Sequence, residues 1–149
     1  MKMDWRKAGN TTVDAGVYEV VVKAWKPDTS RNKNPVIRFT YEIVGPSGNP
    51  NVNRTLVDSI TLTDAAAWRL AWFVGSTGIV LESLAEMDSE SEEFHRVLET
   101  CVGRKLWITT VIDSYEGIQR NKITDYAKSD DQEETEITEE VPDFIKRRG

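Results

Sequence analysis

The sequence predicts a mainly β domain in which three strands are followed by a helical section and then by two more strands. Residues 36–44 alternate strictly, with Ile37, Phe39, Tyr41 and Ile43 on one face. Other β-rich segments recur between stretches of turn-forming residues. A run with apolar residues at helical spacing stands between the third and fourth of them. The length of 149 residues suits one domain with a core of its own.

The first strand is expected at 16–26, where alternation places Lys23 and Trp25 on the face opposite Val20, Val22 and Ala24. A polar loop at 27–35 joins it to the second strand. This loop has proline at both ends and carries the cations Arg31 and Lys33. The first two strands therefore form a hairpin with a basic tip.

The third strand is expected at 54–62, and its weak alternation does not decide which face points inward. The helical section begins at Thr63, an N-cap candidate, and continues to Val74. Its tryptophans Trp68 and Trp72 are four residues apart, and we expect them in a core stripe rather than in a ligand site. A second short helix is expected at 89–100, after a capping box.

The last two strands are expected at 104–112 and 118–126, joined by a turn that contains Tyr115. In the fourth strand, Lys105 and Trp107 lie opposite the aliphatic residues. In the fifth, Arg120 and Lys122 share a face. A tryptophan and a lysine thus lie together on the face away from the aliphatics, as in the first strand.

This order of elements is that of the five-stranded Greek-key barrel called the OB-fold, with a helix between strands 3 and 4. A sandwich or another small barrel with an inserted helix fits the same order. We divide the chain into an N-terminal arm (1–14), an OB-fold domain (15–128) and an acidic tail of disordered composition (129–149).

The formal net charge of −6 is distributed unevenly. The tail holds eight acidic and three basic residues, so residues 1–128 carry only −1. Within that part, Glu82–Glu93 contains six acidic residues and no basic one, which leaves +5 for the remainder. A basic body with an acidic tail is compatible with a nucleic-acid partner.

The sequence contains no motif of a catalytic or cofactor site. Phosphate-binding glycine loops and Cys or His pairs are absent, so we expect a non-enzymatic protein with no cofactor and no metal. The one cysteine, Cys101, and the one histidine, His95, are expected to be a packed thiol and a solvated side chain. We find no membrane span or signal peptide and expect a cytoplasmic protein.

A surface that carries both aromatic side chains and cations suits single-stranded nucleic acid, because bases stack on aromatic rings and cations contact phosphates. The stacking candidates are Trp25, Trp107 and Tyr115. The phosphate-contact candidates are Lys23, Lys26, Arg31, Lys33, Arg38, Lys105, Arg120 and Lys122. The alternatives are solvated surface charges and, for the two tryptophans, packing beneath a loop or the N-terminal arm.

Several short motifs of the chain resemble a family of small phage-encoded proteins, long catalogued as a domain of unknown function. They are Ala15-Gly-Val-Tyr-Glu-Val20, Thr29-Ser-Arg-Asn-Lys-Asn-Pro-Val-Ile-Arg-Phe39, Glu42-Ile-Val44, Ala67-Trp-Arg-Leu70, Val102-Gly-Arg-Lys-Leu-Trp-Ile108, Tyr115-Glu-Gly117 and Asn121-Lys-Ile-Thr-Asp-Tyr126. The resemblance spans about residues 12–127. It implies a phage single-stranded DNA-binding protein that acts in replication or recombination.

The tail is similar to the acidic tails of single-stranded DNA-binding proteins, whose Pro/Phe tip recruits replication partners. The corresponding tip here is Val141, Pro142, Asp143, Phe144 and Ile145. It is followed by Lys-Arg-Arg-Gly, which departs from a tip that ends in a free carboxylate.

Three hypotheses follow, of which the third, an enzyme such as a nuclease, would need a carboxylate cluster with a metal that the sequence does not reveal. The first is a sequence-tolerant binder of single-stranded DNA, monomer or dimer, whose tail competes for the basic groove. The second is a protein-interaction or virion-assembly module that uses the same aromatic face. The first predicts that Trp25→Ala or Trp107→Ala weakens binding without unfolding the chain, and that deletion of 129–149 tightens it.

Overall fold

The computed structural model describes residues 12–81, 92–129 and 135–137. The strands are β1 (Gly16–Thr29), β2 (Pro35–Gly45), β3 (Thr55–Thr61), β4 (Ile79–Leu81), β5 (Lys105–Tyr115), β6 (Ile118–Lys128) and β7 (Thr135–Ile137). The helices are the 3₁₀ helix η1 (Asp64–Ala66) and the α-helices α2 (Ala67–Ser76) and α3 (Glu92–Cys101).

Five long strands form one antiparallel sheet in the order β3-β2-β1-β5-β6. The first four of these strands along the chain therefore have the 4-1-2-3 arrangement of a Greek key. The helices α2 and α3 lie between the third and fourth. The prediction of a mainly β domain with a five-stranded sheet and a helical insertion is confirmed, and the architecture resembles the OB-fold.

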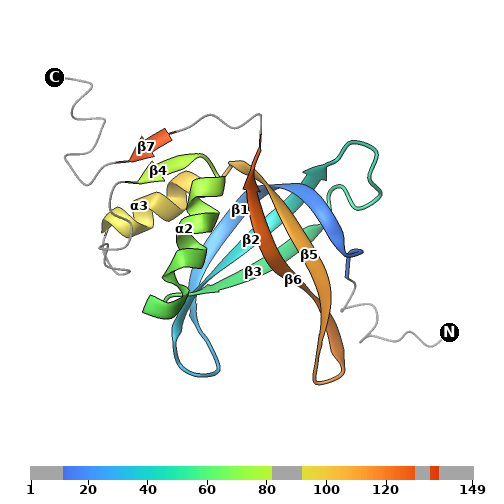
Figure 1. The fold of residues 1–149 in the computed structure, drawn as a ribbon, viewed down its shortest axis with the longest axis horizontal. Coiled ribbons are helices and arrows are strands. Elements are labelled where there is room, and N and C mark those ends of the chain that lie inside the picture. Colours follow the sequence, from blue (N-terminus) through green and yellow to red (C-terminus); the bar gives the residue numbers. More distant parts are fainter. Residues whose placement is uncertain (1–11, 82–91, 130–134, 138–149) are drawn as a thin grey trace.

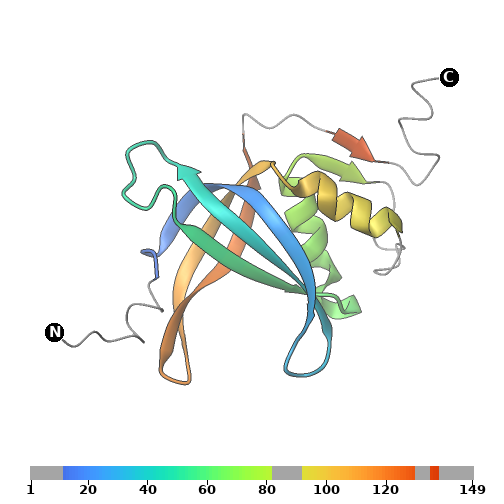
Figure 2. The same ribbon diagram turned by 180° about the vertical axis from the view of Figure 1, so that it is seen from behind.

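The sheet curls until its two edge strands, β3 and β6, approach each other (Figures 1 and 2). The hairpins β1–β2 and β5–β6 project side by side from one end of the barrel, at the bottom of Figure 1. The helices lie along one side of the barrel, and α2 begins near the base of the β1–β2 hairpin. The short β4–β7 pair lies at the end away from the hairpins.

The core fills the inside of the curled sheet and is closed by the two α-helices. Phe39 of β2 packs against Phe73 of α2 with ring centroids 4.2 Å apart. From α3, Val97, Leu98 and Cys101 are buried in the same cluster. Burial raises the pKa of the Cys101 thiol to about 12, so the expectation of a packed cysteine agrees with its environment.

Two expectations for the first helix need correction. Thr63 precedes η1 rather than an α-helix, and its side chain makes no capping hydrogen bond. Trp72 packs against the core, but Trp68 does not, because 63% of its surface is exposed. The buried face of α2 is instead formed by Leu70, Phe73 and Val74, which leaves Trp68 on the far side of the helix.

The ends of the domain extend beyond the predicted boundaries. Val13, expected in the arm, is buried, and its backbone N–H and C=O both pair with the Asn121 side chain. Ser129 is also buried and donates a hydrogen bond to Glu19. Residues Thr135–Ile137 form β7, parallel to β4, so this part of the tail prediction is wrong. The predicted partner tip, 141–145, lies outside the described residues.

A buried carboxylate, Asp58 of β3, joins the two edges of the sheet. Tyr41 of β2 and Tyr126 of β6 both donate hydrogen bonds to its Oδ2 atom, at 2.9 and 2.5 Å. Arg69 of α2 contacts its Oδ1 atom at 3.0 Å and also donates to the Ile123 carbonyl of β6 at 2.8 Å. Side chains therefore connect β3 to β6 and α2 where no backbone ladder does.

The electrostatics of this cluster follow from burial. Burial raises the pKa of Asp58, and the Arg69 charge with the two tyrosine hydroxyls opposes that rise. Burial and the nearby carboxylate raise the pKa of both Tyr41 and Tyr126, so both hydroxyls keep their protons and donate. A buried carboxylate is stable here because each of its oxygens has a partner.

In the part of the chain that the structure describes, no helix is long and apolar enough to cross a membrane.

The Asp58–Arg69 pair leads to a pH-dependent prediction. Arg69→Ala removes the cation, so the folded-state pKa of Asp58 rises further above its unfolded value of about 3.9. A raised carboxyl pKa gives stability that is complete below the unfolded pKa and is lost as the pH rises through the folded one. We expect a loss of about 2–3 kcal/mol in the free energy of unfolding at pH 7, and a smaller loss at pH 4.

Urea unfolding at both pH values measures this difference. Arg120→Ala is the matched control, because that arginine is exposed and its ion pair with Asp113 is long, at 3.9 Å. An equal loss for Arg69→Ala at pH 4 and pH 7 would contradict the role of the buried charge.

Candidate nucleic-acid interface

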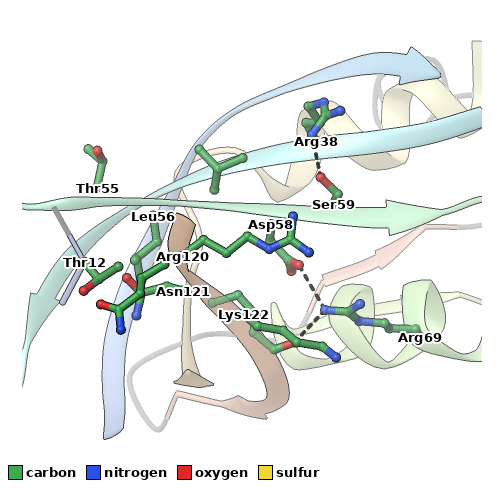
Figure 3. Close-up of a pocket in the computed structure, with 13 residues that line it drawn as sticks. Thr12, Arg38, Thr55, Leu56, Asp58, Ser59, Arg69, Arg120, Asn121 and Lys122 are labelled. Atoms are coloured by element: carbon green, nitrogen blue, oxygen red, sulfur yellow. Dashed lines mark hydrogen bonds and ion pairs between the residues drawn. The ribbon is translucent and has the colours of Figure 1, made fainter. Parts of the chain in front are cut away.

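A groove of about 450 Å³ lies along the seam between β3 and β6 (Figure 3). Its lining comes from β2, β3, β6, α2 and the segment before β1. The lining residues are Thr12, Arg38, Thr55, Leu56, Val57, Asp58, Ser59, Arg69, Gln119, Arg120, Asn121, Lys122 and Ile123. We call this the β3–β6 groove.

The lining is polar and carries a positive charge. Four cationic side chains face one carboxylate, and that carboxylate is already engaged by Arg69. Only three of the thirteen lining residues are apolar. Pockets for small organic ligands are mostly apolar, so this lining suits an anionic partner better.

The cations reach the groove from separate elements. Arg120 and Lys122 lie two residues apart on β6 and share the exposed face of that strand. In Figure 3 their side chains and that of Arg69 run toward the part of the groove where Asp58 lies. Arg38 stands on the β2 side and donates to Ser59 at 2.9 Å.

A row of outward-facing residues extends this surface across the sheet. Lys26 of β1 is the register partner of Arg38, which in turn pairs with Ser59 of β3. Arg38 also contacts Asp28 at 2.6 Å, and this interaction lowers the pKa of that exposed carboxyl. The basic surface thus continues from the groove onto the β1–β2 hairpin.

The two hairpin tips lie beyond the groove and meet each other. Residues 30–34 form a compact loop in which the Ser30 carbonyl accepts from the Lys33 N–H, and Lys33 has a positive φ of 63°. At the other tip, Glu116 and Gly117 both have positive φ, as a two-residue hairpin turn of type I′ requires. Arg31 and Glu116 approach to 3.5 Å. Because both side chains are exposed, this pair contributes little to stability.

The structure brings together part of the predicted binding set. Arg38, Arg120 and Lys122 line the groove, Lys26 lies beside it, and Arg31 and Lys33 occupy the neighbouring tip. Tyr115 ends β5 at the opposite tip, and only its backbone is described.

The remaining predicted residues lie away from the groove. Lys23 forms an ion pair with Glu42 at 3.4 Å. Lys105 and Trp107 are partly exposed on the outer face of β5, opposite the buried Leu106, as predicted. Trp107 pairs in register with Glu19 and Ala127, and neither of these lines the groove.

The predicted orientation of Trp25 is wrong. A bulge places Val22 opposite Tyr41 but Ala24 opposite Thr40, so Lys23 is an extra residue in the strand. Alternation is thereby reversed, and Trp25 faces inward opposite the buried Phe39. Its ring lies 5.6 Å from His95 of α3, and its indole N–H donates to Glu99 at 2.8 Å.

Sequence reasoning missed Arg69 and Asp58. Arg69 follows an alanine-rich helix start, where an isolated arginine is typical of a solvated face. Asp58 shares a face of β3 with Leu56 and Ile60. A carboxylate between two apolar residues on the inward face is the signal that could have indicated a buried partner. In the described part of the chain, no group of three or more His, Cys, Asp or Glu side chains is placed to hold a metal ion.

Comparisons with known proteins add little to this geometry. No protein-family model matches the chain, and no curated protein sequence matches it. Among solved structures, the fold is similar to yeast RPA bound to single-stranded DNA, with 14% identity, 78% of each chain covered and a TM-score of 0.35. A similarity of this size does not assign a shared function, and the phage family stays a prediction from the sequence motifs.

Because Trp25 packs on α3, Trp25→Ala is expected to affect stability and not binding. We expect a loss of about 1–3 kcal/mol in the free energy of unfolding, below the roughly 3–5 kcal/mol of a fully buried aromatic residue. Urea unfolding measures it, with the exposed Trp68→Ala as control. An unchanged unfolding curve together with weaker oligonucleotide binding would instead favour a Trp25 that stacks on bases.

Proposed function

We propose that this chain is a non-enzymatic, sequence-tolerant single-stranded DNA-binding protein whose phosphate contacts lie in the β3–β6 groove. In the phage setting that the sequence motifs suggest, it acts in DNA replication or recombination. The observation that carries the proposal is the position of the groove. It lies over the outward residues of β3, Thr55, Val57 and Ser59, beside both projecting hairpins.

Barrels of this topology bind their ligands at the corresponding position. OB-fold domains bind oligonucleotides over strands 2 and 3, between the loop joining strands 1 and 2 and the loop joining strands 4 and 5. Here those loops are residues 30–34 and the turn at Glu116–Gly117. A strand lying in the groove would pass between cations on both walls, Arg38 on one side and Arg120 with Lys122 on the other.

Phosphate contacts of this kind release counterions, so the proposal predicts strong salt dependence. Arg120→Ala and Lys122→Ala are each expected to weaken binding to labelled oligo-dT. Each should also reduce the slope of log K against log salt by about 0.7 for each phosphate that the variant no longer neutralises. Fluorescence titration at several salt concentrations measures both effects.

Lys23→Ala is the matched control, because it removes an exposed strand cation that does not line the groove. It should leave the slope unchanged. Absence of oligo-dT binding by the unmodified chain at low salt would refute the proposal and favour the protein-interaction module. A loss for Lys23→Ala equal to that for Lys122→Ala would refute the groove as the site.

The acidic tail is proposed to compete with DNA for these cations and to recruit partner proteins. Deleting 130–149 removes β7 and its pairing with β4 but retains Ser129 and its hydrogen bond to Glu19, and it leaves the five-stranded sheet complete. We expect tighter oligo-dT binding at low salt, with the difference shrinking as salt screens the charges. Unchanged affinity at low salt would contradict competition by the tail.

A further inference from the structure

Trp68 is the most exposed of the large hydrophobic side chains that the structure describes, with 63% of its surface accessible. It stands one helical turn before Trp72, and the two rings lie 5.9 Å apart at 25°, close to parallel. Trp72 in turn meets Tyr126 edge-on at 5.3 Å. One side of the Trp68 ring is therefore supported by a stack that is anchored in the barrel.

This stack adjoins the β3–β6 groove. Arg69, the next residue along α2, lines the groove and holds both Asp58 and the Ile123 carbonyl of β6. Its guanidinium also lies 5.7 Å from the centre of the Tyr126 ring, the ring that Trp72 packs against. The aromatic stack and the cationic groove therefore meet at Arg69, which lines the groove and lies over the Tyr126 ring.

An exposed aromatic pair on a helix has an ordinary explanation, since aromatic residues four apart support the helix itself. That explanation accounts for the contact between the rings but not for the place of the pair on either side of Arg69 in the sequence, a residue that lines the cationic groove. A flat ring with one supported side and an accessible surface fits a planar, apolar partner. Beside phosphate-binding cations, the partner of that chemistry is a nucleic-acid base.

We propose that Trp68 stacks on an unpaired base of the strand whose phosphates lie in the β3–β6 groove. The inference rests on the proposed function and assigns its main stacking contact to α2 rather than to the predicted Trp25 or Trp107. Because Arg69 holds the helix to β6, the ring keeps a fixed place relative to Arg120 and Lys122, and binding does not require the helix to be reordered.

The test compares oligo-dT with an oligomer of the same length that carries abasic sites throughout. The unmodified chain should bind oligo-dT more tightly, because only that ligand offers bases to stack. Trp68→Ala should weaken oligo-dT binding at least about fivefold and leave binding of the abasic oligomer unchanged. Trp68→Phe should retain most of the affinity, because it keeps an aromatic face.

Trp107→Ala is the control for an aromatic residue outside the groove, and urea unfolding verifies that each variant is folded. If Trp68→Ala binds oligo-dT as the unmodified chain does, or if Trp107→Ala alone removes the preference for bases, the inference is overturned while the groove still stands. If the unmodified chain binds neither oligomer, the proposed function itself fails.

Discussion

The carboxylate of Asp58 is the interaction on which the seam of the barrel depends. The sheet has two free edges, and β3 and β6 share no backbone ladder. One buried side chain takes hydrogen bonds from β2 and β6 and an ion pair from α2. Because a buried carboxylate is costly unless its oxygens are paired, the positions of these three elements are fixed relative to β3.

The same cluster explains why a cationic surface is found at this seam. Arg69 is held with its guanidinium between Asp58 and the edge of β6, and the remaining cations stand on the strands on either side. An edge without a partner strand leaves room for a groove, and the arginine that neutralises the buried charge also forms part of its wall. The structural role of Asp58 and the proposed binding role of the groove are thus linked through one side chain, Arg69.

The alternation of apolar and polar residues, together with the turn residues, was enough to predict the strands, because each strand buries one of its two faces. The strict pattern of β2 predicted its inward residues, Ile37, Phe39, Tyr41 and Ile43, all of which are buried. The prediction failed at Trp25, where one inserted residue reverses the alternation and no local signal marks the bulge. It also failed at Trp68, because a helix with apolar residues on several sides does not reveal which side packs.

The groove itself could be predicted only in part. The cations of β2 and β6 were recognised as a set, but their meeting across the seam depends on the curl of the sheet, a tertiary property. The position of Arg69 in the groove could not be predicted without its contact to Asp58, which is 11 residues away on another element. Charge counts along the chain therefore indicated a basic body without locating the wall that α2 contributes.

The state of Cys101 has a practical consequence for chemical modification. It is the one cysteine in the sequence, it is buried beside Thr77, and burial raises its pKa to about 12. Thiolate is the form that reacts with alkylating reagents and oxidants, so the folded chain offers them almost none. A substitution such as Gln119→Cys would then introduce a single reactive thiol in the lining of the groove, without removal of the native cysteine. A dye or a crosslinker can then be attached at that one position while Cys101 stays unchanged in the core.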